Sequence, residues 1–167
     1  MDRNNAGFTL IELIVVISII LIFLGLSLPR YNDFSSQLKL RNEAKKLIDV
    51  LELAKKKALS SDLQDKTCTN FTGYRVTLST NNYSLIFCCN SGCSTPTNVN
   101  AYAFNNTNIT IFSGTGDYNF SPLMISPSFI SNTIRLKNSA ISGTNQCIDI
   151  SVSLIGIVEL NETLVGC

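Results

Sequence analysis

The chain has 167 residues, the length of one ordinary domain with an additional segment. Its formal net charge of +1 argues against the strong single-sign field that nucleic acids or acidic substrates would require. Histidine is absent, so the commonest general base and the commonest metal ligand are both missing. We therefore expect neither an enzyme nor a protein with a cofactor or a metal site.

The first predicted element is an apolar helix. Residues 1–7 are short and polar, and residues 8–28 then form an apolar run. At 1.5 Å per residue this run would make roughly 32 Å of helix, close to the hydrocarbon thickness of a bilayer. It is interrupted by few polar or small residues, namely Thr9, Glu12, Ser18, Gly25 and Ser27. The run predicts a membrane-spanning segment.

The helical pattern continues from 29 to 61, but its character changes to amphipathic. Apolar residues now recur at alternating steps of four and three, which places them on one helix face. This stripe consists of Leu40, Ala44, Leu47, Leu51, Ala54 and Ala58. Pro29 lacks an amide hydrogen, and we expect a kink or local unwinding there.

The region 62–167 is rich in Asn, Ser and Thr and predicts strands and loops. Residues 74–80 and 83–89 are β-rich runs on either side of Asn81-Asn82, which predicts a hairpin. Further strands are expected at 109–112, 133–137, 147–153 and 155–160. The predicted fold class is α+β, with one long N-terminal helix packed on an antiparallel β-sheet.

A carboxylate so near the start of the apolar run needs an explanation, because an ionisable group inside a bilayer is costly and is usually paired. A small residue, Gly7, lies before the run and not after it, so the run does not read as a cleaved secretory signal. Cleavage after Gly7 would leave a free amino group on Phe8, four residues before Glu12. A neighbouring copy shifted along its axis could bring that amino group to Glu12.

The stretch GFTLIEL (7–13), followed by the apolar run and Pro29, closely resembles the N-terminus of type IV pilins and type II secretion pseudopilins. The resemblance implies that a prepilin peptidase cleaves after Gly7 and methylates the amine of Phe8. It also implies that Glu12 recruits and aligns subunits, and that Pro29 matches a proline where the helix loosens in filaments. The leader departs from the family in having a single basic residue, Arg3, offset by Asp2.

The rest of the chain resembles the H-type minor pseudopilins by pattern, over 43–61, 73–87 and a late strand pair around Gly156. Some relatives bind DNA through arginines after a late-strand glycine, whereas Gly156 is followed here by Ile157 and Val158. Lys55-Lys56-Lys57 is the one basic cluster, and we interpret it as a solvated surface. Nucleic acid is therefore not expected as a partner, and a DNA-uptake pilin is kept only as an alternative.

The cysteines favour disulfides over catalysis or zinc. A thiol nucleophile would have no histidine partner, and the spacing gives no C-x-x-C pairs. The six lie beyond the apolar run, in the part expected outside the cytoplasm, at Cys68, Cys88, Cys89, Cys93, Cys147 and Cys167. The sequence leaves their pairing open. As many pilins carry a C-terminal disulfide loop, our hypothesis is a Cys147–Cys167 bridge, with the others bridged near the first hairpin.

The sequence thus predicts a structural subunit with a prepilin leader (1–7), a transmembrane and assembly helix (8–28), an amphipathic half-helix (29–61) and a β-sheet head (62–167). The resemblance implies a helical homo-oligomeric filament, with other pilin subunits, a prepilin peptidase and an inner-membrane assembly platform as partners. The subunit would lie in the cytoplasmic membrane before assembly and in an extracellular or periplasmic filament afterwards. A minor pseudopilin of a type II secretion system is the alternative. The sequence leaves open whether the chain is a major or a minor subunit, which ligand its head binds and whether the head is glycosylated.

Overall fold

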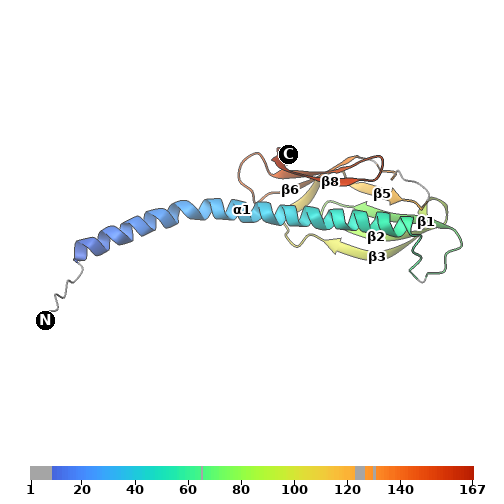
Figure 1. Ribbon diagram of the computed structural model, residues 1–167, viewed down its shortest axis with the longest axis horizontal. Coiled ribbons are helices and arrows are strands. Elements are labelled where there is room, and N and C mark those ends of the chain that lie inside the picture. Colours follow the sequence, from blue (N-terminus) through green and yellow to red (C-terminus); the bar gives the residue numbers. More distant parts are fainter. Residues whose placement is uncertain (1–8, 65, 123–126, 130) are drawn as a thin grey trace, which may run out of the picture.

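A single helix organises the molecule. The computed structural model describes residues 9–64, 66–122, 127–129 and 131–167, with the backbone alone at 26–30. Helix α1 (Leu10–Leu59) begins after its N-cap Thr9 and is followed by its C-cap Ser60. Its first half extends away from the rest of the chain and its second half lies along a β-rich head (Figure 1). The predicted α+β fold with a long N-terminal helix is confirmed.

The helix is continuous through Pro29, so the local unwinding expected there is not found. The axis instead curves along the first half (Figure 1). A proline removes one backbone hydrogen bond, and the helical turns on both sides remain bonded, which is enough to keep the segment helical.

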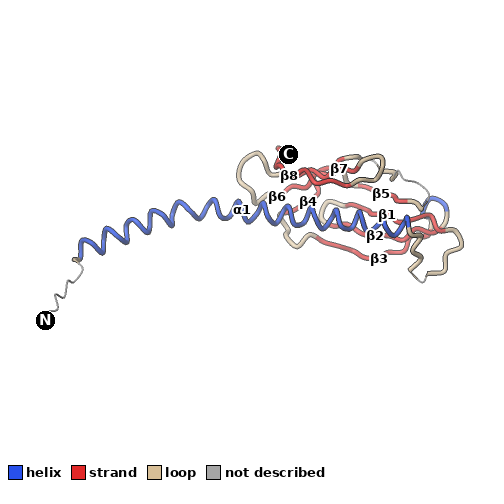
Figure 2. The backbone as a smooth tube through the Cα atoms, viewed as in Figure 1, coloured by secondary structure: helices blue, strands red, loops and turns tan. Residues whose placement is uncertain are grey.

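The head contains two antiparallel four-stranded sheets where we expected one (Figure 2). The first has the strand order β3-β2-β1-β5 and the second β4-β6-β7-β8. The strands of the first sheet are β1 (Phe71–Leu78), β2 (Asn82–Cys89), β3 (Thr95–Ala103) and β5 (Gly116–Phe120). Those of the second are β4 (Ile109–Ser113), β6 (Thr133–Asn138), β7 (Cys147–Val152) and β8 (Val158–Val165). A short 3₁₀ turn, η1 (Ser91–Cys93), follows β2.

Three strand predictions needed correction. Strand β3 was missed because its sequence, TPTNVNAYA, is polar and its side chains are mostly exposed at a sheet edge. Strand β5 was not among the predicted strands, and it begins at Gly116 within the glycine-containing stretch SGTGDY (113–118). The last strand was expected at 155–160 but runs over 158–165, since residues 153–157 form the turn that precedes it.

The predicted apolar stripe of α1 forms the centre of the core. All six of its residues are fully buried. They pack in one cluster with apolar side chains from both sheets, including Tyr74, Val76, Leu85, Ile134, Leu136, Ile148 and Ile150. The helix therefore joins the two sheets, and burial of this shared face stabilises the head.

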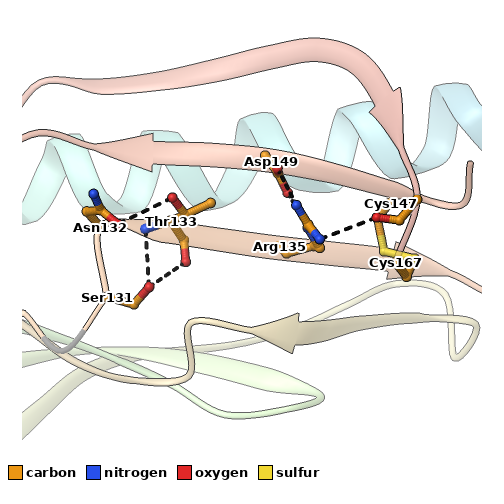
Figure 3. Close-up of polar contacts among 8 residues, drawn as sticks. Ser131, Asn132, Thr133, Arg135, Cys147, Asp149 and Cys167 are labelled. Carbon is orange, nitrogen blue, oxygen red and sulfur yellow. Dashed lines mark hydrogen bonds and ion pairs between the residues drawn. A yellow bond between two sulfur atoms is a disulfide. The ribbon is translucent and has the colours of Figure 1, made fainter.

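Three disulfides close the head: Cys68–Cys89, Cys88–Cys93 and Cys147–Cys167. The third is the pair we hypothesised, and the other two lie at the β1–β2 hairpin as expected. Figure 3 shows the third beside an ion pair between neighbouring strands, in which Arg135 contacts both carboxylate oxygens of Asp149 at 2.6 and 2.8 Å. Arg135 also donates to the carbonyl of Gly166, so the C-terminus is held by a covalent and a polar contact.

Candidate assembly region

The start of α1 is closed by a capping box. The backbone amide and the hydroxyl of Thr9 donate to Oε2 of Glu12 at 2.9 and 2.8 Å. The amide of Glu12 donates back to the Thr9 hydroxyl at 3.4 Å. This arrangement satisfies two amides that a helix start otherwise leaves unpaired.

Sequence analysis missed this role of Glu12, although the spacing Thr9-x-x-Glu12 is the signature of a capping box. Both contacts use Oε2, and the structure gives Oε1 no hydrogen-bond partner among the described residues. The carboxylate can therefore cap its own helix and still offer one oxygen to another chain. Gly7 and Phe8, the predicted processing residues, lie outside the described residues.

After the cap, α1 exposes apolar side chains on all sides. The large apolar residues from Leu10 to Leu24 are between 47% and 76% exposed. An apolar surface of this extent is unusual for a soluble monomer and marks a region that contacts another apolar partner.

Within the part of the chain whose side chains the structure describes, no helical stretch is both long and apolar enough to cross a bilayer. The predicted membrane-spanning segment, 8–28, also includes residues outside that description, and it stays a prediction.

Two polar contacts mark where α1 joins the head. The carboxylate of Asp33 accepts a hydrogen bond from the amide of Ser142 at 3.1 Å. The side-chain amide of Asn138 donates to the carbonyl of Ser36 at 2.9 Å. Asn138 is the last residue of β6 and Ser142 lies in the β6–β7 connection, so this end of the second sheet is fastened to α1.

The basic cluster of α1 is occupied by contacts within the chain. Lys55 donates to the carbonyl of Gly156 at 2.7 Å, Lys56 lies 3.6 Å from Glu52, and Lys57 lies 2.6 Å from Asp62. The hydrogen bond from Lys57 lowers the pKa of the Asp62 carboxyl. These contacts agree with a surface role for the lysines and add no support for a phosphate-binding site.

The described part of the head contains no group of histidine, cysteine, aspartate or glutamate residues that could hold a metal ion. A groove of about 830 Å³ lies between α1 and the β3–β4 loop, with asparagines and lysines along it. Its acidic residue, Glu43, is paired with Lys46 at 2.8 Å. The apolar helix is thus the feature of this molecule that most clearly requires a partner.

Comparison with known proteins finds similarity that includes the same N-terminal segment. The family described as "Prokaryotic N-terminal methylation motif" matches residues 2–28, which include the Gly7–Phe8 junction and Glu12. The type IV major fimbrial protein FimA of Dichelobacter nodosus (strain VCS1703A) is 36% identical over 70 residues. The N-terminal region of the chain is thus similar to that of a type IV pilin and carries the methylation motif.

The similarity to the pilin FimA covers 42% of this chain and 40% of the relative. A second FimA of Dichelobacter nodosus is 38% identical over 69 residues, 41% of this chain and 40% of the relative. The chain thus spans about 40% of the length of the curated relatives it matches. No solved structure gives a significant match. The resemblance of the remaining chain to H-type minor pseudopilins stays a prediction.

Proposed function

We propose that this chain is a structural subunit of a type IV pilus-like filament. It is made as a membrane-anchored precursor, cleaved after Gly7 and methylated on the amine of Phe8 by a prepilin peptidase. An inner-membrane assembly platform then moves it, with other pilin subunits, into an extracellular or periplasmic filament. The observation that carries this proposal is the methylation motif on a helix whose large apolar side chains from Leu10 to Leu24 are between 47% and 76% exposed.

The apolar half of α1 is the assembly element in this proposal. In the membrane it contacts lipid, and in the filament it contacts the same helix of other subunits. Lipid and helix surfaces are both apolar, so replacing lipid contacts by helix–helix contacts gains little free energy for each pair of helices. A specific polar contact is therefore needed to fix the axial register of neighbouring subunits. Glu12, with Oε1 unpaired among the described residues, supplies that contact to the Phe8 amine of a neighbouring subunit.

The head carries no proposed catalytic role, as the pilin family is structural. Three disulfides and a helix that joins two sheets suit a domain exposed outside the cytoplasm. A minor pseudopilin of a type II secretion system remains the alternative, because the methylation motif and the exposed helix would serve such a subunit equally well.

The test is to shear filaments from the source cells and to analyse them by peptide mass spectrometry. We expect this chain in the sheared fraction, with an N-terminal peptide that begins at a methylated Phe8. Dominance of the chain identifies a major pilin, and a trace amount identifies a minor pilin or pseudopilin. Normal processing of a variant with a bulky residue in place of Gly7, or an unprocessed chain in the filaments, contradicts the proposal.

A further inference from the structure

The turn between β7 and β8, residues 153–157, exposes three large apolar side chains within four positions. Leu154 is 72%, Ile155 58% and Ile157 45% exposed. Elsewhere the region after α1 is rich in Asn, Ser and Thr, so this composition is distinctive for a loop of the head. We call these three residues the apolar turn.

The backbone of the apolar turn is held in place. The amide of Gly156 donates to the carbonyl of Ser153 at 2.8 Å, and the amide of Ser153 donates to the carbonyl of Ile157 at 2.9 Å. The Ser153 hydroxyl accepts a further bond from the amide of Ile157 at 2.9 Å. Gly156 has a φ of 73°, which glycine adopts without strain. These three hydrogen bonds hold the backbone of the turn in place, while its three apolar side chains are exposed.

The position of the turn follows from two contacts with α1. Lys55 donates to the carbonyl of Gly156, and Arg41 donates to the carbonyl of Glu162 at 3.1 Å. Strand β8 therefore runs antiparallel to α1, and the turn lies beside the C-terminal part of the helix. Figure 1 shows the apolar first half of α1 leaving the head at its opposite end.

The described part of the chain thus exposes apolar side chains on the helix segment Leu10–Leu24 at one end and on the apolar turn near the other. They are too far apart to meet within a chain, since residues 24 and 55 alone are separated by roughly 46 Å of helix. Two different surfaces that meet between copies make a heterologous contact, and repetition of such a contact builds an open helical array. A second copy displaced along the axis of α1 would bring the two surfaces to the same height.

We infer that the apolar turn of one subunit docks on the apolar helix segment Leu10–Leu24 of a second subunit in the filament. This inference rests on the proposed function and adds a contact between head and helix to it. The required displacement is roughly 46–68 Å along the helix, set by the distance from residue 55 to residues 24 and 10. The contact buries the side chains of the apolar turn, which water otherwise surrounds.

The contact can be mapped by photocrosslinking in intact filaments. A benzophenone amino acid is placed in the full-length chain in place of Ile155, and the matched control carries it in place of Phe112, which is 52% exposed on β4. We expect the probe at 155 to give dimers whose second peptide falls within 10–24, and the probe at 112 not to do so. Crosslinks from 155 to a head peptide, to lipid or to another protein, or none in probe-containing filaments, would overturn the inference.

A second measurement removes the apolar turn without a probe. We expect Leu154→Ser/Ile155→Ser to lower sheared filaments about ten-fold, while the chain is cleaved and retained in the membrane at the wild-type level. Phe112→Ser is the control and leaves the yield unchanged. Wild-type cells without filaments contradict the proposed function, whereas normal wild-type filaments and an unchanged yield for the turn variant contradict only this inference.

Discussion

The side-chain amide of Asn138 donates a hydrogen bond of 2.9 Å to the backbone carbonyl of Ser36, although 102 residues separate them in sequence. The Asn138 side chain is fully buried, and its Oδ1 accepts a second bond from the amide of Ala140 at 3.0 Å. A buried polar side chain with both ends paired holds its partners firmly. This asparagine, the last residue of β6, therefore fastens the end of that strand to the part of α1 that packs on the head.

The first prediction concerns this contact. We expect Asn138→Ala to lower the free energy of unfolding by about 1–3 kcal/mol, because it removes the two hydrogen bonds that the buried side chain makes to the Ser36 carbonyl and the Ala140 amide. Urea unfolding of the full-length chain in detergent measures the loss. Asn145→Ala, at an exposed position of the β6–β7 connection, is the control. Equal stability of Asn138→Ala and the wild type would show that the contact is not structural.

The second prediction separates the two roles of Glu12. Glu12→Gln keeps a side chain that can complete the capping box but removes its charge, whereas Thr9→Ala removes the cap and keeps the charge. We expect Glu12→Gln and Glu12→Ala to lower filament yield about ten-fold or more while the subunit stays in the membrane. We expect Thr9→Ala to assemble nearly normally. Equal losses in Thr9→Ala and Glu12→Gln would mean that Glu12 acts only on its own helix.

The third prediction compares two disulfides. The Cys147–Cys167 bridge spans 20 residues and the Cys88–Cys93 bridge spans 5, so the first restricts the unfolded chain more. We expect losses of about 3 kcal/mol for Cys147→Ser/Cys167→Ser and about 2 kcal/mol for Cys88→Ser/Cys93→Ser. Urea unfolding of both variants checks the order. In addition, native wild-type protein should not react with a thiol label, and substantial labelling would contradict the three bridges.

The fourth prediction concerns stability at high pH. Burial raises the pKa of Tyr83 to about 12, with a smaller contribution from the Glu43 carboxylate. Since the phenol of an unfolded chain titrates near pH ~10, the unfolded state loses its proton first as the pH rises. The stability from the neutral phenol is therefore complete below pH ~10 and is lost as the pH rises from about 10 towards 12.

Urea unfolding at pH ~9 and pH ~11 measures this loss. Burial likewise raises the pKa of Tyr74 and Tyr118 to about 12, so Tyr83→Phe should reduce the loss without abolishing it. Tyr31→Phe, at a residue that is 70% exposed, is the control and should behave like the wild type. An unchanged pH dependence in Tyr83→Phe would remove Tyr83 from the explanation.

What the sequence could not predict depended on contacts between distant residues. Strand β3 is polar enough to resemble a loop, and only its pairing with β2 makes it a strand. The partners of the adjacent Cys88 and Cys89 also could not be predicted. Cys88 bonds to Cys93 in η1, whereas Cys89 bonds to Cys68 in the segment before β1. The apolar turn was not predicted either, because residues 155–157 were assigned to a strand expected at 155–160.

The sequence by itself determined the features that are encoded locally. The helix, the stripe that α1 buries and the first hairpin follow from side-chain periodicity, and the methylation motif is a run of adjacent residues that needs no fold to be recognised. The tertiary structure alone decided that the stripe joins two sheets, that Asn138 fastens the helix to the head and that an apolar turn stays uncovered. Each of these results depends on contacts between segments that are distant in sequence. Side-chain periodicity predicts which face of an element is buried, but not which other element covers it.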